Sequence, residues 1–359
     1  MAKNYKCFIE IGSSTVELTG VVFENENFGR CFHKICRYDG IKNNFFRNPE
    51  KLYGIIESLA GEYADYLNRS LSEIYLILPQ RFFRSKHTVK RTEIKNGIVN
   101  KFDVSDIISE SLVDVEDCEK LECVPIAYKV RDDYIDNPIG QECNFMELVS
   151  VSVGILSRIN EFFIDVSKRM SVNFIYVPVM RPVLDKLQNA LMTNRSSRVV
   201  LYFADDYIEI CYCEMRAVIA EKTIEVGNAD FIEALTELCG TDRETAAELI
   251  KHVNFNLSGG NYVVGGAEGK VFDALEVNDS VKKLYGLLAE ELKKALASLI
   301  GDAILPVYMT GKAICGVRGA EQLFTEKIGM PISVLVPNLL LWNTTADYVL
   351  AGMIENLIK

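Results

Sequence analysis

The stretch Val199-Val200-Leu201-Tyr202-Phe203-Ala204-Asp205-Asp206-Tyr207-Ile208-Glu209-Ile210 decides how this chain is interpreted. Branched and aromatic residues alternate on both sides of Ala204-Asp205-Asp206, which predicts two strands joined by a tight turn. Because the turn carries two adjacent carboxylates, it places negative charge at the end of the hairpin. The stretch therefore predicts a β-hairpin with an acidic turn.

Strand–turn–strand units recur in both halves of the chain, and helices follow each of them. The elements expected in the first half are strands within 6–24 around a Gly-Ser-Ser-Thr turn, a helix at 49–68 and a buried strand at 74–78. Those expected in the second half are ribbons at 199–226, a largely helical region at 228–301 with a hairpin at 258–266, and a periodic helix at 281–300. Strands at 305–310 and 332–336 and helices at 319–328 and 344–357 complete it. The recurrence predicts a duplicated α/β fold.

Residues 81–152 break this rhythm. They contain basic, alternating segments, a short predicted helix near Ser105–Leu112 and further strands that end at 148–153. A helix at 155–170 and a strand at 172–177 then resume the earlier pattern. We therefore expect a compact inserted subdomain of α/β character.

Composition and charge limit the classes of function. The chain has 359 residues, too many for a single core, so two lobes or several subdomains are expected. Hydrophobic residues make up 49% and charged residues 25%, as in ordinary globular proteins. The net charge of −11 disfavours non-specific binding to nucleic acid and to anionic membranes.

The ten cysteines are spread from Cys7 to Cys315, mostly inside apolar segments. Neither the Cys31/Cys36 pair nor the Cys211/Cys213 pair has zinc-site spacing with histidines beside it, so we expect buried thiols and no metal site. The N-terminus lacks a signal-peptide pattern, and a reducing cytoplasm is the expected compartment.

Short motifs in one order along the chain resemble the FtsA family of cell-division actin homologues. The matching segments are Glu10-Ile11-Gly12-Ser13-Ser14-Thr15, Gly40-Ile41-Lys42 with the helix after it, Asn137-Pro138-Ile139-Gly140, Val226–Ala234, Ala247–Lys251, Thr310-Gly311, Gly329–Ile332 and Val336-Pro337-Asn338. Each motif alone is weak evidence, but the motifs occur in the same order as in the family and span nearly the whole chain. The pilus protein PilM has the same architecture, and Asn137–Gly140 favours FtsA over it.

The resemblance implies an actin-like (ASKHA) fold with duplicated ribonuclease H-like lobes and an FtsA-type 1C insertion. The implied boundaries are 1–72 and 153–195 for subdomain 1A, 73–152 for the inserted 1C-like subdomain, 196–229 and 304–359 for subdomain 2A, and 230–303 for subdomain 2B. In this family such an insertion makes protein contacts.

The resemblance also implies an ATP site, which the sequence partly lacks. Gly12, Ser13, Ser14 and Thr15 keep a turn whose N–H groups can face a phosphate. The family's second turn is glycine-rich, whereas this chain has Ala204-Asp205-Asp206. At ~4 Å from a γ-phosphate, each carboxylate would cost on the order of 1–4 kcal/mol. A divalent ion bridging Asp205 or Asp206 to phosphate is the alternative.

Two further segments are candidates for nucleotide contact. Gly311 opens the last loop, and Lys312 stands where the family has glycine, either to pair with phosphate or as a solvated charge. Glu248 and Lys251 fall at the family's adenosine contact, or form a surface ion pair worth ~0.3 kcal/mol. No residue stands out as a base for phosphoryl transfer. We therefore expect no catalytic residue and weak or absent binding of ATP and Mg²⁺.

Three functions remain open at this point. The first is an FtsA-like scaffold that binds FtsZ-like or other division proteins and can self-associate. The second is a PilM-like adaptor that holds an extended peptide of a membrane-anchored partner. The third is an active actin-type ATPase, which the missing glycines disfavour.

A basic run supplies the candidate partner surface. Arg84, Lys86 and Lys90 lie within Arg81–Arg91, on a chain whose net charge is −11. The run predicts either an edge strand protected by lysines or a strand that pairs with an acidic partner, which could be a second copy or a peptide.

FtsA proteins carry a membrane-binding helix beyond the core, and here the sequence ends just after the helix expected at Thr344–Leu357. We expect that helix to pack in the core, so peripheral attachment to the inner membrane face would require a tail that this sequence lacks.

Overall fold

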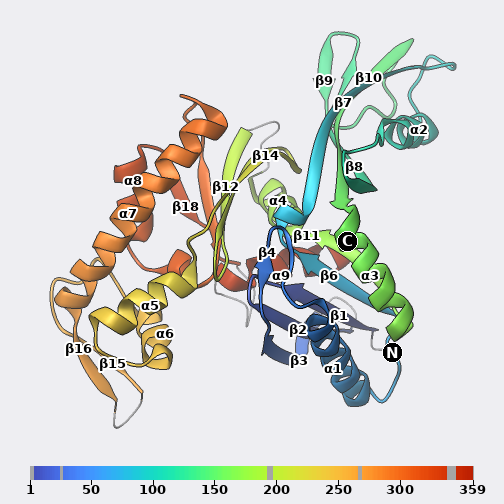
Figure 1. Cartoon of the computed structure of the whole chain (residues 1–359). Helices are drawn as coiled ribbons and strands as arrows, with labels where there is room; N and C mark the ends of the chain where they lie inside the picture. Colours follow the sequence, from blue (N-terminus) through green and yellow to red (C-terminus); the bar gives the residue numbers. More distant parts are fainter. Residues whose placement is uncertain (1–3, 25–26, 192–196, 266–268, 338–344, 359) are drawn as a thin grey trace. The chain divides into compact units, whose positions relative to one another are not determined.

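The computed structural model describes residues 4–24, 27–191, 197–265, 269–337 and 345–358 (Figure 1). They form two compact units. Unit 1 contains the residues up to 195 together with 214–219 and those from 356 onward. Unit 2 contains 196–213 and 220–355.

Unit 1 is built on a five-stranded sheet with the order β11-β6-β1-β2-β3. The strands β1, β2 and β3 are antiparallel neighbours, whereas β6 and β11 join the other side of β1 in parallel. The bounds are β1 (Asn4–Ile11), β2 (Thr15–Glu24), β3 (Asn27–Arg37), β6 (Glu73–Leu78) and β11 (Asn173–Pro178). A small ribbon of β4 (Ile41–Lys42) and β5 (Phe45–Phe46) precedes the first helix.

The helices of unit 1 include α1 (Pro49–Leu67), α3 (Ser157–Met170) and α4 (Met180–Leu191). Asn48 caps α1 by accepting a hydrogen bond from the N–H of Lys51, and proline suits its first turn. The buried stripes of α1 and α3 share one core cluster with the alternate β1 residues Cys7, Ile9 and Ile11. Side chains about 3.6 residues apart on the helices and two residues apart on the strand therefore pack in one core, as expected.

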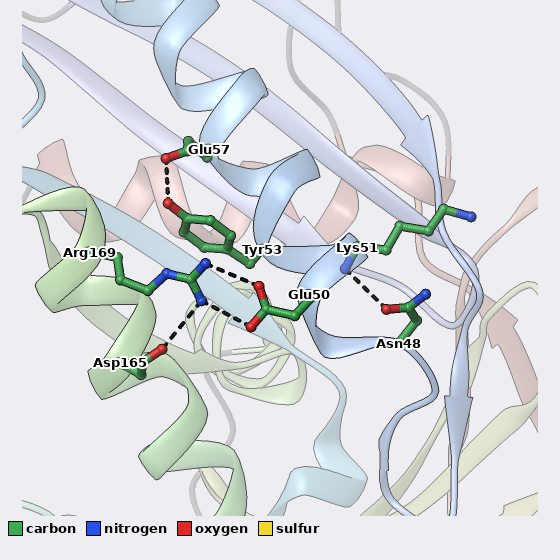
Figure 2. A network of polar contacts seen from close by, with 7 residues as sticks. All are labelled: Asn48, Glu50, Lys51, Tyr53, Glu57, Asp165 and Arg169. Atoms are coloured by element: carbon green, nitrogen blue, oxygen red, sulfur yellow. Dashed lines mark hydrogen bonds and ion pairs between the residues drawn. The ribbon is translucent and has the colours of Figure 1, made fainter.

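An exposed ion pair joins α1 to α3 (Figure 2). Arg169 donates to both carboxylate oxygens of Glu50 at 3.0 Å, and its guanidinium lies 3.6 Å from the centroid of the Tyr53 ring. Asp165, one turn earlier on α3, is 3.5 Å from the same guanidinium. The hydrogen bonds from Arg169 lower the pKa of the Glu50 carboxyl.

Because the folded-state pKa of Glu50 is lowered, the stability that it contributes is present at neutral pH and is lost as the pH falls through that pKa. We expect Glu50→Gln to lower the urea midpoint at pH 7, and the difference from the wild type to shrink as the pH falls through the lowered pKa of Glu50. Asp65→Asn, the same charge change farther along α1, is the control and should have little effect. Equal midpoints of Glu50→Gln and wild type at pH 7 would contradict this account.

A second sheet of unit 1 lies between β6 and β11 in sequence. Its order is β7-β10-β8-β9, with β7 (Phe83–Glu93), β8 (Cys118–Val130), β9 (Asp133–Ile135) and β10 (Phe145–Leu156). Figure 1 shows these strands in cyan and green, beside α2 (Lys101–Ser111). A small core that includes Ile107, Tyr128 and Leu148 joins α2 to this sheet.

The separate sheet begins later than the sequence boundary at residue 73. The strand β6 (73–78) pairs with β1 and β11 in the five-stranded sheet, and the inserted sheet starts at Phe83. The inserted helix also starts earlier than expected, because Asn100 and Asp103 form a capping box before Ser105. The pattern of β6 showed a buried strand but not the sheet to which it belongs.

Unit 2 repeats the arrangement of the first sheet. Its five-stranded sheet has the order β14-β13-β12-β17-β18, in which β17 runs parallel to β12 and to β18. The bounds are β12 (Ser197–Phe203), β13 (Ile208–Glu214), β14 (Ala217–Ile224), β17 (Val307–Gly311) and β18 (Ile332–Val334). In both units three consecutive strands are followed by two parallel ones, so the predicted duplication is confirmed.

Helices and one hairpin accompany this sheet. Their bounds are α5 (Asn228–Leu238), α6 (Arg243–His252), β15 (Asn261–Val264), β16 (Lys270–Asp273), α7 (Ala274–Ile300), α8 (Ala320–Ile328) and α9 (Tyr348–Ile358). The helix α7 begins seven residues before the predicted start at 281, because Asp273 accepts the N–H groups of Leu275 and Glu276 and caps it there. In the described ranges no helix combines the length and apolar character needed to cross a bilayer.

Candidate functional site

The first candidate turn, Gly12–Thr15, joins β1 to β2 in unit 1. The N–H of Gly12 donates to the carbonyl oxygen of Thr15 at 2.8 Å, and the Tyr38 hydroxyl donates to the carbonyl of Gly12 at 2.8 Å. The side chain of Ser13 is buried at 1% exposure. The turn is therefore fixed by its own hydrogen bonds, and the Gly12 N–H is already used within it.

The acidic turn lies in unit 2, between β12 and β13, as predicted. The N–H of Ala204 donates to the carbonyl of Tyr207 at 2.9 Å and closes the turn. The carbonyls of Ala204 and Asp205 accept the N–H groups of Asn228 (3.0 Å) and Ala229 (2.7 Å). These two N–H groups belong to the first turn of α5, where a helix can otherwise bind an anion. Here the acidic turn itself occupies these donors.

Gly227 permits this close approach. A Cβ placed there would lie 2.3 Å from the carbonyl oxygen of Asp205 and 2.6 Å from the nitrogen of Asp206. Its own N–H donates to the Asp230 carboxylate at 2.7 Å, which completes the start of α5. The glycine of the Val226–Ala234 motif thus has a structural role, because the main chain of the acidic turn packs directly against it.

The third candidate loop meets the same region of unit 2. The N–H of Lys312 donates to the Phe203 carbonyl at 2.8 Å, and Gly311 has a φ of +115°. Asn228 accepts the N–H of Ile314 at 3.3 Å. The structure therefore brings together the acidic turn, the start of α5 and the loop with Gly311 and Lys312.

Glu248 and Lys251 lie on α6 and bond to one another. The Lys251 ammonium is 2.6 Å from the Glu248 carboxylate, and about half of each side chain is exposed. The helix α6 packs against the segment Ala313–Gly316 of the third loop. This geometry matches the surface ion pair that the i,i+3 spacing predicts, and a role in adenosine contact stays a prediction.

The three basic candidates for partner binding lie on β7 of unit 1, and each makes local contacts. Lys90 is 3.2 Å from the Glu110 carboxylate, and Lys86 donates to the carbonyl of Asp114 at 3.3 Å. The guanidinium of Arg84 donates to the carbonyl of Phe83 at 2.7 Å. The side chains of Lys86 and Lys90 therefore point to the face of the sheet that α2 and its following loop cover.

A cavity of about 980 Å³ in unit 1 adjoins the beginning of β7. Its wall combines four segments that are distant in sequence, namely Asn44, Arg84–Lys86, Val115–Asp117 and residues 156–161 near the start of α3. Cations and carboxylates both line it. Because the wall forms only when these segments fold together, no sequence motif signals it.

A buried carboxylate, also missed from the sequence, organises another part of unit 1. Asp185 accepts hydrogen bonds from Arg181 at 3.2 Å and from Asn356 at 2.9 Å, and Arg216 is 3.5 Å away. Nearby, burial raises the pKa of Glu122, which Arg181 opposes from 3.5 Å. These contacts attach the turn 214–219 and residue 356 to α4 within this unit.

No protein-family model matches the chain, and no curated protein matches it by sequence. Solved structures do resemble it. A chain of the PilM–PilN type IV pilus biogenesis complex aligns with a TM-score of 0.61 at 12% identity, covering 99% of this chain and 98% of that chain. The ethanolamine utilization protein EutJ from Carboxydothermus hydrogenoformans aligns at 0.52 and 14% identity, covering 98% and 89%.

MreB5 of Spiroplasma citri bound to ADP aligns at 0.50 and 9% identity, covering 99% of this chain and 98% of that chain. At such identities a likeness shows the fold alone. The two five-stranded sheets have equivalent strand orders, and each of the three alignments covers almost the whole chain. Both observations indicate the same fold. The chain is an α/β protein with an actin-like fold of two duplicated lobes.

Proposed function

We propose that this chain is a protein-binding adaptor or scaffold with an actin-like fold and a weak nucleotide site. The observation that carries the proposal is the acidic turn of unit 2. Its carbonyls accept the first-turn N–H groups of α5, and it adds the charges of Asp205 and Asp206. An ATP phosphate would meet negative charge where an actin-type ATPase offers glycine N–H groups. The residues present therefore fit ATP and Mg²⁺ poorly.

The inserted sheet supports the proposed binding of a protein partner. It has its own small core, and the cavity of about 980 Å³ runs beside its base. A cavity of this volume is in the upper part of the range of ligand pockets and is large enough for several residues of an extended peptide. We assign this sheet to the 1C-like subdomain of the FtsA resemblance.

Two kinds of partner fit this adaptor. An FtsZ-like or other division protein is favoured by Asn137–Gly140, which forms a turn in which Asn137 accepts the N–H of Ile139 and the Gly140 N–H donates to Val99. A membrane-anchored peptide is favoured by the likeness to a chain of a complex that contains PilN. In both cases the chain would act at the inner face of the membrane through its partner.

A pull-down and a titration test this proposal together. The full chain is immobilised and offered an FtsZ C-terminal peptide or a pilus-type N-terminal peptide, and Mg-ATP is titrated by calorimetry. We expect one peptide to be retained and ATP to bind weakly or not at all. Retention of neither peptide together with a Kd for ATP near 1 µM, about −8 kcal/mol, would overturn the adaptor assignment in favour of an ATPase.

A further inference from the structure

The strand β7 is an edge strand of the inserted sheet. In the part of the chain that the structure describes, it pairs with β10 alone, through eleven consecutive residue pairs without a bulge. The edge strand β3 of the other sheet, in contrast, is interrupted by a bulge opposite Gly20 and Val21. Edge strands present alternate N–H and C=O groups outward, and bulges are one common means of protecting them. The strand β7 lacks that protection.

Charge and exposure along β7 indicate what can pair with it. The strand carries four cations, at positions 84, 86, 90 and 91, and one carboxylate, Glu93. Arg84, Lys86 and Lys90 share one face of the strand, since they are separated by even numbers of residues. Val89, on the other face, is 60% exposed in the middle of the strand. An edge that was only guarded by lysines would not require an exposed valine at its centre.

A second copy of β7 is a poor partner for this edge. Antiparallel pairing about Thr88 places Lys86 directly opposite Lys90 twice, and pairing about His87 places Arg84 opposite Lys90. Like charges directly opposite in a sheet are destabilising. An acidic strand removes this repulsion, since carboxylates would then stand opposite the cations of β7.

We propose that β7 binds an extended acidic segment of a partner protein by strand addition. Carboxylates at alternate positions of the segment face Arg84, Lys86 and Lys90, and apolar residues between them cover Val89. The segment continues beside the cavity whose wall includes Arg84–Lys86. The inference rests on the proposed adaptor function and adds the chemistry of the partner.

The probe is a fluorescent eleven-residue peptide of alternating glutamate and valine, and binding to the full chain is measured by fluorescence polarisation. We expect it to bind at least tenfold more tightly than an alternating lysine–valine peptide. N-methylation of the peptide's valine amides, or of its glutamate amides, distinguishes main-chain strand pairing from electrostatic attraction between the peptide and β7. Only one of the two sets of N–H groups faces β7, so one modified peptide should lose at least tenfold in affinity and the other should not. Equal affinities of these two peptides would overturn strand addition.

Protein variants locate the site. The triple variant Arg84→Glu, Lys86→Glu, Lys90→Glu should bind the acidic peptide at least tenfold more weakly. The double variant Lys86→Gln, Lys90→Gln should also bind the acidic peptide more weakly than the wild type. This variant creates no repulsion with Glu110. The matched control changes three other ion-paired cations, Lys51→Glu, Arg243→Glu and Lys294→Glu, and should stay within about twofold of wild type. Unchanged binding by both test variants would overturn the inference.

The two proposals can fail separately. If the triple variant still retains the partner peptide that the wild type retains, the β7 inference is wrong and the adaptor function stands. If the acidic peptide binds at β7 but the chain retains neither partner peptide and binds Mg-ATP with a Kd of about 1 µM, the adaptor function is wrong and the edge remains an acidic-peptide site.

Discussion

Replacing both Asp205 and Asp206 by glycine is expected to raise the affinity for Mg-ATP at least tenfold. Each carboxylate within ~4 Å of a phosphate costs on the order of 1–4 kcal/mol, and about 1.4 kcal/mol corresponds to a factor of ten. The double change removes both charges. Calorimetry of the wild type and the variant in the same buffer measures the difference.

Two control variants separate charge from turn shape. Asp205→Asn with Asp206→Asn removes the charge and keeps the side-chain size, so it should recover most of the gain. Asp132→Asn with Asp133→Asn makes the same change in net charge at two exposed residues where β9 of unit 1 begins, and should leave the affinity as it is. A lower affinity of the glycine variant would instead indicate that a divalent ion bridges these carboxylates to phosphate.

Gly311→Ala is expected to destabilise the protein severely, by about 4 kcal/mol. A Cβ at this position would lie 2.2 Å from the Phe203 carbonyl oxygen and 2.8 Å from its nitrogen, and both are backbone atoms that cannot rotate away. The φ of +115° adds strain for any L-residue with a side chain. Overpacking costs about 1–3 kcal/mol and the unfavourable backbone about 1–2 kcal/mol. Thermal unfolding should show a midpoint lowered by roughly 10 °C.

Two other glycines of unit 2 serve as matched controls. Gly329 has a φ of +83° but open space around it, so Gly329→Ala should cost only the strain, ~1 kcal/mol. Gly286 lies within α7 with open space, and Gly286→Ala should stabilise by up to ~1 kcal/mol. If Gly311→Ala unfolds no earlier than Gly329→Ala, the close packing of the loop on Phe203 is not a constraint on the fold.

Much of the fold followed from periodicity in the sequence. The helix at 49–67 carries an apolar repeat that matches its buried positions, and the hairpin at 199–210 and the strand at 73–78 are apolar runs that are buried almost throughout. The sheet in which a buried strand pairs is a tertiary property, which explains why β6 was assigned to the insertion. The start of α7 was missed because Asn278 and Asp279 weaken the helical pattern there, although Asp273 supplies a cap.

The candidate site was predictable only in its residue types. The sequence showed carboxylates at 205 and 206, but not that the main-chain carbonyls of this turn bond to α5. Main-chain hydrogen bonds between distant segments leave little trace in residue identity, apart from the glycine at 227 that allows them. The cavity beside β7 is assembled from four separate segments and was invisible for the same reason.

The position of the inserted sheet has a consequence for how unit 1 folds. The strands β6 and β11 are parallel neighbours, yet residues 79–172 lie between them in the chain. Because α2 and the outer part of the inserted sheet have a core of their own, this part can form first and shorten the flexible loop to be closed, whereas Val124 and Val153 of the same sheet pack in the main core of unit 1. Loop-closure entropy rises by only ~0.6 kcal/mol for each doubling of length. The outer part of the insertion can therefore lengthen, shorten or change its surface during evolution at little thermodynamic cost to the lobe that carries it.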